Sequence, residues 1–286
     1  MGRPDHARAR RGARLAVRLI LLSLAVLFAL GGPLPFWLRR VFPSLSPLSM
    51  IASAVSQRGA YAGIFWLAPP LVVLLLAFFK GRLFCRWICP AGTLFSLLSP
   101  RQPVARLCRR RWGGLFFWTI LGGSLAGLPI LLFLEPQPML QRDLAWFGRA
   151  LSLPAMIPGL VFPLFLALGA IQPMVWCTHF CPAGHCFDFL RNLRQSPAVA
   201  FNRDRRELLA GLFIGVPAAY AAARFPGVGS SAKPPVLPPG ARDSGVFGAA
   251  CHRCYACVDS CPTGVLRASF RPDRPLISWF QPEMQP

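Results

Sequence analysis

Residues 85–92, with the sequence CRWICPAG, recur as CTHFCPAG at residues 177–184, which lie 92 positions further along the chain. Both stretches read C-x3-C-P-A-G. The match continues beyond them, because Phe95 corresponds to Phe187 and Leu98 corresponds to Leu190. We call these two stretches the elbows. Such an internal repeat predicts two similar halves, each with a membrane-spanning helix, an elbow and a short amphipathic segment on the membrane surface.

The cysteines of the elbows are candidate metal ligands. On a helical turn, positions i and i+4 share a face, so each elbow would present two thiols in one direction. We therefore expect Cys85, Cys89, Cys177 and Cys181 to hold one iron-sulfur cluster jointly. A transient copper or zinc site and a redox-active dithiol in each elbow are the alternatives, whereas structural disulfides are disfavoured in a reducing compartment.

A second cysteine motif lies near the C-terminus, where residues 251–262 read CHRCYACVDSCP. The spacing C-x2-C-x2-C-x3-C-P is that of bacterial ferredoxins, and it predicts a loop that binds a [4Fe-4S] cluster. Zinc sites usually separate two cysteine pairs by a dozen or more residues, which disfavours zinc here. The predicted ligands are Cys251, Cys254, Cys257 and Cys261.

The composition is that of a membrane protein. Hydrophobic residues make up 54% of the 286 residues and charged residues only 14%, and the apolar residues form long blocks. Four blocks approach the roughly 20 residues needed to span a bilayer, at 15–38, 61–79, 114–134 and 153–176. A fifth block, 208–223, is marginal by hydropathy alone.

The residues before the fifth block resemble a twin-arginine export signal, because the paired Arg205 and Arg206 precede x-Leu-Leu and a weakly apolar stretch. The alternative is that they anchor a helix end at the cytoplasmic face. Either interpretation makes 208–223 a span. By the positive-inside rule, the 19 Lys and Arg residues of the predicted inner segments, against 5 in the two outer loops, place the N-terminus in the cytoplasm. Five spans then leave the C-terminus outside the cytoplasm.

These features predict a mainly α fold, a polytopic membrane helix bundle of about five spans with a small C-terminal ferredoxin-like domain. The domains would be a basic cytoplasmic arm at 1–14, the bundle with its two elbows at 15–223, a Pro/Gly linker at 224–245 and a [4Fe-4S] domain at 246–286. The net charge of +21 is spread over membrane loops, so the predicted partner surface is the lipid bilayer and not nucleic acid.

Several further residues are weaker candidates. Cys186 follows Cys181 closely and is either a spare ligand or small apolar filling, and Cys108 also stands outside the motifs. His179 and His185 flank the second elbow and could ligate haem or contact a quinone, but a surface loop is the commoner setting. Glu135 and Gln137 could line a quinol pocket or form a polar helix end.

The paired C-x3-C-P elbows behind predicted spans, followed by a ferredoxin-type run, resemble the NapH, NosR and CcoG group of membrane polyferredoxins. The resemblance covers roughly residues 61 to 262. It implies that the chain passes electrons between the quinol pool and extracytoplasmic reductases, or supports the maturation of copper enzymes. Its implied metal-binding positions are the four elbow cysteines and the four cysteines from Cys251 to Cys261.

The sequence therefore predicts an integral-membrane electron-transfer protein of the cell membrane. Its donor would be a quinol or a cytoplasmic partner, and its acceptor an extracytoplasmic redox protein; the alternative is a maturation or redox-sensing factor for a copper or other respiratory enzyme. Members of the group usually have two ferredoxin runs, whereas this chain has one. Either Cys261 completes the same cluster, or the fourth ligand comes from another subunit or a non-cysteine group.

Overall fold

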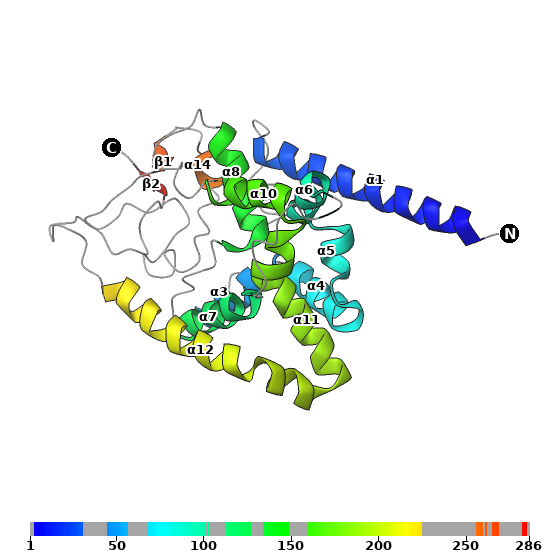
Figure 1. The fold of residues 1–286 in the computed structure, drawn as a ribbon. Helices are drawn as coiled ribbons and strands as arrows, with labels where there is room; N and C mark the ends of the chain where they lie inside the picture. The colour runs from blue at the N-terminus through cyan, green and yellow to red at the C-terminus, as the bar shows by residue number, and fades with distance from the viewer. Residues whose placement is uncertain are drawn as a thin grey trace.

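The computed structural model describes residues 3–30, 45–56, 68–100, 102, 112–126, 134–148, 160–224, 256–259, 261, 265–268 and 282–284. These residues form a bundle of helices with a small two-stranded sheet near the C-terminus (Figure 1). The helices are α1 (Arg3–Leu30), α3 (Pro47–Ser56), α4 (Ala68–Lys80), α5 (Leu83–Trp87), α6 (Pro90–Leu98), α7 (Gly113–Leu125), α8 (Pro136–Gly148), α10 (Val161–Ile171), the π-helix η3 (Trp176–Phe180), α11 (Pro182–Gln195), α12 (Pro197–Arg224) and α14 (Ala256–Asp259). The strands are β1 (Leu266–Ala268) and β2 (Pro282–Met284).

The internal repeat is visible in the order of the elements. The first half runs α4, α5, α6 and the second runs α10, η3, α11. The two halves pack crosswise, because α6 contacts α10 and α11 contacts α4. Arg194 on α11 strengthens the second contact by donating to the carbonyl of Phe79 at 2.9 Å, where a cation complements the C-terminal end of α4.

Aromatic side chains fill the space between the two halves. Phe95 and Phe187, the equivalent positions of the repeat, are both completely buried. Phe95 lies edge-on to Phe162 with ring centroids 5.4 Å apart, and Phe187 meets Phe84 at 6.0 Å. Such pairs add to the stability gained by burying apolar area. The equivalence of these positions, predicted from the repeat, is confirmed by their shared place in the core.

The contact between α7 and α12 depends on glycine. Gly211 and Gly215 lie four residues apart on α12, and a Cβ at Gly215 would lie 2.5 Å from the Thr119 carbonyl oxygen and 2.9 Å from the Gly123 nitrogen of α7. At Gly211 a Cβ would meet the Trp118 side chain. The two backbones therefore approach closely, as in the small-xxx-small packing typical of membrane helices.

The predicted spans coincide with helices in part. Within the described residues, one stretch, Gly12–Leu30, is long and apolar enough to cross a bilayer, whereas Ala68–Lys80, Gly113–Leu125 and Val161–Ile171 are apolar but shorter. Residues 31–38, 61–67, 127–133 and 153–159 of the predicted spans lie outside the described part. The fifth predicted block belongs to α12, which begins at Pro197 and not at Leu208. The mainly α class is confirmed.

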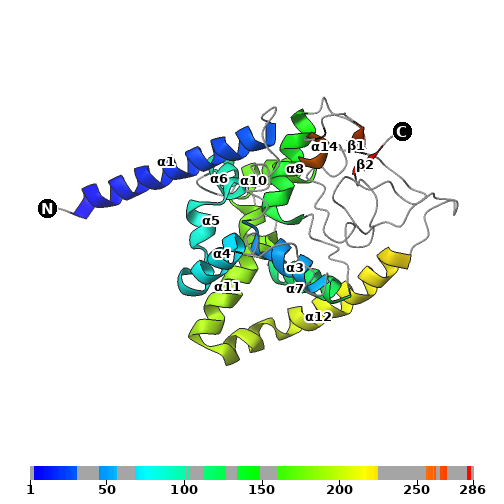
Figure 2. The same cartoon turned by 180° about the vertical axis from the view of Figure 1, so that it is seen from behind.

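The described residues of the C-terminal region form the short helix α14 and the strands β1 and β2. The strands β1 and β2 pair antiparallel, with Leu266 opposite Met284, and α14 contacts β1. Figure 2 shows these elements at the opposite end of the molecule from the N-terminus of α1. The predicted linker 224–245 lies outside the described residues apart from Arg224, and the predicted domain boundaries stay predictions.

We expect Gly215→Leu to lower the free energy of unfolding by about 1–3 kcal/mol, because the larger side chain must push α12 away from the α7 backbone. Thermal or denaturant unfolding of the protein in detergent measures the loss. Ala210→Leu is the matched control, since Ala210 is exposed on the same helix. Equal stability of the two variants would contradict the close approach.

Candidate metal centre

Each elbow places its second cysteine at the start of a helix. Cys89 precedes α6 with φ −63° and ψ 112°, and Cys181 precedes α11 with φ −61° and ψ 113°. A proline follows each cysteine as the first helical residue, where its fixed φ suits the helix and its missing N–H costs no hydrogen bond. The two halves of the repeat thus build the same local geometry.

The expectation that both cysteines of an elbow lie on one helical turn is wrong in detail. Cys85 belongs to α5 and Cys177 to the π-helix η3, and the chain becomes extended at Cys89 and Cys181 before the next helix begins. The cause is the proline, whose ring disfavours the helical conformation in the preceding residue. The cysteine pair is therefore divided between the end of one helix and the beginning of another.

The glycine of each elbow contacts the second thiol. The Gly92 N–H points at the Sγ of Cys89 at 3.4 Å, and the Gly184 N–H points at the Sγ of Cys181 at 3.3 Å. A Cβ at Gly92 would lie 3.3 Å from the carbonyl oxygen of Cys85, tighter than most such contacts. Both thiols thus sit at a helix N-terminus, where N–H groups and the helix dipole favour negative charge.

All four elbow cysteines line one cavity of about 220 Å³, many times the space that one water needs. Cys89 and Cys181 are buried, and Cys85 and Cys177 are partly buried. Met174, with a φ of 53°, also borders the cavity just before the second elbow. The structure therefore brings together the four elbow cysteines in the way that the repeat predicts.

The surroundings keep these thiols protonated when no metal is near. Burial raises the pKa of Cys85 and of Cys177 well above the ordinary value, and the neighbouring cysteines raise both further. Burial also raises the pKa of Cys181 to about 12, although the Gly184 N–H and Arg82 act in the opposite direction. Four adjacent thiolates would repel one another, so a cationic metal is the partner that makes them stable together.

Two arginines hold the elbow helices at equivalent positions. Arg82 forms a two-pronged ion pair with Asp188 on α11, at 2.8 and 2.6 Å, and donates to the Cys177 carbonyl at 3.0 Å. Arg18 on α1 donates to the Gly92 carbonyl at 2.9 Å and to Ser96 on α6 at 2.5 Å. Ser96 and Asp188 are 92 residues apart, so each elbow helix receives one guanidinium at the same point of the repeat.

Buried polar groups line another part of the cavity wall. Glu135, 1% exposed, accepts a hydrogen bond from Ser46, and its second carboxylate oxygen has no hydrogen-bond partner among the described residues. Gln137 likewise has an unpartnered side-chain oxygen there. Burial raises the pKa of Glu135 to about 8, against hydrogen bonds from Ser49 that lower it. Glu135 is thus largely a neutral carboxylic acid at pH 7.

The other candidates lie elsewhere. Cys186 is buried beside Phe117 and Trp118 and does not border the cavity, which favours a packing role. The Nδ1 of His179 lies 2.6 Å from the Oγ1 of Thr178, and His179 does not border the cavity. Of the ferredoxin-type run, Cys257 lies in α14 and Cys261 follows it, whereas Cys251, Cys254 and also Cys108 lie outside the described residues.

Sequence reasoning missed Arg18 and Arg82 as neighbours of the elbows. The charge count treated both as topological signals, and nothing in the local pattern pairs Arg82 with Asp188 or Arg18 with Ser96. The repeat offers one signal, since Ser96 and Asp188 are equivalent positions with hydrogen-bonding side chains. A partner for each could have been sought on that basis.

The donor set fits an iron-sulfur cluster. Thiolates are the usual ligands of such clusters, and N–H groups directed at the sulfurs together with nearby charge tune their potential. The elbows supply four thiols, two of them with N–H contacts, and Arg82 lies beside them. Copper(I) or zinc could also bind four thiols, so the donor set alone does not select iron.

Comparison with known proteins favours an iron-sulfur cluster over copper or zinc. A family model described as a 4Fe-4S binding domain matches residues 62–115 and 140–197, each segment containing one elbow. The methylamine utilization ferredoxin-type protein MauN of Paracoccus denitrificans is 30% identical over 220 residues, which cover 70% of this chain and 76% of that protein. The ferredoxin-type protein NapH of Haemophilus influenzae is 25% identical over 59% of this chain and 62% of its own length. NapH of Escherichia coli is 25% identical over 70% of this chain and 66% of its own. No protein of solved structure matches the chain.

The raised pKa of Glu135 predicts a pH-dependent stability. The carboxyl group titrates at about 8 in the fold but near the ordinary value of 4.5 in the unfolded chain. Between these values the folded protein holds a proton that the unfolded chain has lost, so the free energy of unfolding falls as pH rises. We expect Glu135→Gln to lose less thermal stability than the wild type between about pH 5.5 and pH 8.5. The same pH dependence in both proteins would contradict the buried neutral acid.

Proposed function

Because the chain belongs to the family of NapH-like ferredoxin-type proteins with a 4Fe-4S binding domain, we propose that it is a membrane iron-sulfur protein that transfers electrons. The observation that supports this most strongly is the single cavity lined by Cys85, Cys89, Cys177 and Cys181. These four residues would hold a cluster between the two halves of the repeat. When bound, the cluster supplies a one-electron carrier.

The protein's own groups would set how readily that site accepts an electron. Arg82 and the N–H groups of Gly92 and Gly184 place positive charge beside the thiols, which favours added negative charge. Phe84 and Phe187 border the same cavity, and Phe95 with Phe162 packs behind it, so apolar rings limit the access of water. We expect the balance of charge and burial to determine the reduction potential.

The ferredoxin-type run would provide a second carrier site. Cys251, Cys254, Cys257 and Cys261 have the required spacing. The region from residue 246 onward is too short to form a sufficient apolar core without help, so the metal would be its main stabilising element. The fourth ligand is Cys261, a group on another subunit or a non-cysteine group.

The exposed surface supports membrane insertion. Leu75 and Phe79 on α4 are 58% exposed, and Phe213 on α12 is 76% exposed. Large apolar side chains are exposed along α1 as well, and such extended surfaces fit lipid better than water. The glycine-mediated contact of α7 with α12 is of the kind that membrane helices use. We propose that the five predicted blocks cross the bilayer.

The charge pattern supports the proposed direction of insertion. The N-terminus would lie in the cytoplasm and the C-terminus outside it. A quinol or a cytoplasmic protein would supply electrons, and an extracytoplasmic reductase or similar protein would receive them. The quinol alternative is supported by Glu135 and Gln137, which line the cavity of the thiols and have unpartnered oxygens.

Replacing Cys177 and Cys181 by Ala should remove about four iron atoms per chain and one set of cluster signals in electron paramagnetic resonance. The reason is that two ligands of the elbow site are lost while the C-terminal run is intact. Cys186→Ala is the matched control, because Cys186 is buried on α11 outside the cavity. An unchanged iron count in the double variant would overturn the shared site.

Reporter fusions test the topology. Alkaline phosphatase fused after Pro286 should be active, and a fusion truncated near Gln195 should be inactive, because one further span separates these points. Replacing Arg205 and Arg206 by Lys should abolish the activity of the full fusion if they form an export signal, since such signals require arginine. A C-terminal reporter that works only in the cytoplasm would contradict the fifth span.

A further inference from the structure

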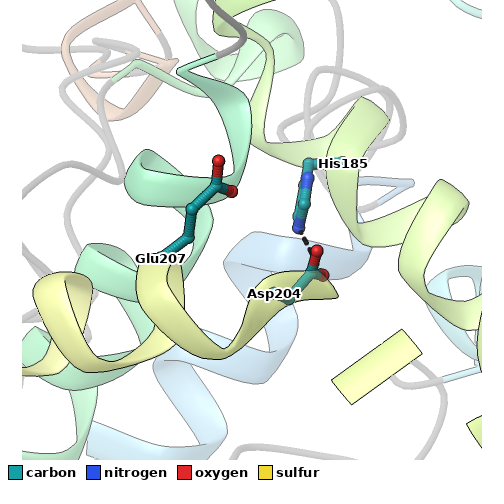
Figure 3. Close-up of side chains that lie close together, drawn as sticks. All are labelled: His185, Asp204 and Glu207. Atoms are coloured by element: carbon teal, nitrogen blue, oxygen red, sulfur yellow. Dashed lines mark hydrogen bonds and ion pairs between the residues drawn. The ribbon is translucent and has the colours of Figure 1, made fainter. Parts of the chain in front are cut away.

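His185, Asp204 and Glu207 form a cluster outside the thiol cavity (Figure 3). One potential ligand atom of each lies within 4.8 Å of those of the other two. His185 Nε2 is 3.0 Å from Asp204 Oδ2, and the Glu207 carboxylate comes from the next turn of α12. The electron-transfer proposal gives these residues no role.

The sequence brings the three side chains together through two adjoining helices. Asp204 and Glu207 are three residues apart on α12, so they share one face. His185 lies in the first turn of α11, and only Ser196 separates the two helices in sequence. Arg205 and Arg206, between the two acids, are both exposed, so the acids point inward while the arginines point outward.

The facing helix α7 is shaped to receive the cluster. A Cβ at Gly114 would collide with a carboxylate oxygen of Glu207 and would lie 2.8 Å from the Cε1 of His185. A Cβ at Gly113 would lie 2.8 Å from the Cys181 carbonyl oxygen. The missing side chain at Gly114 thus leaves the space that the Glu207 carboxylate occupies, and the missing side chain at Gly113 lets α7 approach the Cys181 carbonyl. The close fit restricts where that carboxylate can lie.

The charges of the cluster call for a cation. Two carboxylates held this close repel one another, and an opposite charge between them relieves the repulsion. Among the described residues Glu207 has no ion pair, and Asp204 pairs only with His185. The Asp204 side chain is 11% exposed, so water screens its charge weakly. A positively charged His185 could neutralise Asp204, but Glu207 would still have no opposite charge of its own among the described residues.

We propose that His185, Asp204 and Glu207 bind a divalent first-row transition ion of the Zn²⁺ class. One imidazole nitrogen and two carboxylate oxygens are ligands that Zn²⁺ accepts, and three protein ligands leave one position open to water. Ligand atoms about 2.0–2.2 Å from a tetrahedral zinc lie roughly 3.3–3.6 Å apart. The 3.0 Å separation of His185 Nε2 from Asp204 Oδ2 is close to this value.

The ion would join α11, the helix that begins at the second elbow, to α12, which packs on α7. The backbone N–H of His185 donates to the Cys181 carbonyl at 3.2 Å. Fixing His185 would therefore also steady the second elbow. The ion has a structural role in this proposal. The thiol site does not require it, so the two sites can be tested separately.

The test uses the full-length protein purified with its clusters, and its iron content is measured first to verify that the cysteine thiols are occupied. After dialysis against EDTA, calorimetric titration with Zn²⁺ should show one site per chain in the wild type. Glu207→Gln, which keeps the shape but removes a charged ligand, should weaken binding at least tenfold with no change in iron. Zn²⁺ should raise the melting temperature of the wild type and not that of Glu207→Gln.

Asp5→Asn, which removes a carboxylate from α1, is the matched control and should bind Zn²⁺ like the wild type. Should Glu207→Gln fail to fold, Asp204→Asn replaces it with the same expectations, since Asn still offers His185 a hydrogen-bonding partner. Equal Zn²⁺ affinity in the wild type and the ligand variant would overturn the proposal. Absence of Zn²⁺ binding in the wild type would also overturn it and would leave a His–Asp ion pair as the explanation.

Discussion

Four thiols that share one buried cavity impose the constraint on which the surrounding helices depend. Burial and mutual repulsion both oppose the thiolate form, as the raised pKa values of Cys85, Cys177 and Cys181 show. Two kinds of group in the fold favour negative charge there, namely the helix N-termini at the second cysteine of each elbow and the guanidinium of Arg82. The helix N-termini lie at the thiols because the proline of each elbow ends one helix and begins another.

The repeat and the meeting of its four cysteines could be predicted from sequence, because a recurring eight-residue motif specifies the same local geometry twice. The equivalent burial of Phe95 and Phe187 followed from the same register. The division of each cysteine pair between two helices was missed, although the proline carries the signal. The ion pair of Arg82 with Asp188 joins residues 106 positions apart, and no local pattern specifies such a pairing. The same holds for the glycine contact of α12 with α7.

Membrane character illustrates a different limit of sequence reasoning. Hydropathy identifies apolar blocks, but it does not say where each helix begins and ends. The structure gives α12 a start at Pro197, well before its apolar part. One helix therefore carries the paired arginines, the two acids that face His185 and the glycines that contact α7. A segment that looks like a signal followed by a span in sequence is therefore also a scaffold that packs on the second elbow helix.

The crosswise packing of the two halves has a consequence for biosynthesis. Because α6 packs on α10 and α11 on α4, neither half can complete its core alone. At about 5–20 residues per second, the ribosome needs roughly 5–18 s to make the 92 residues that separate equivalent positions. During that interval Cys85 and Cys89 have no partner thiols, and the first apolar half has no second half to cover it. Completion of the second elbow is therefore the earliest moment at which the four-thiol site can assemble, and a nascent chain that stalls before it leaves a reactive dithiol for cellular quality control.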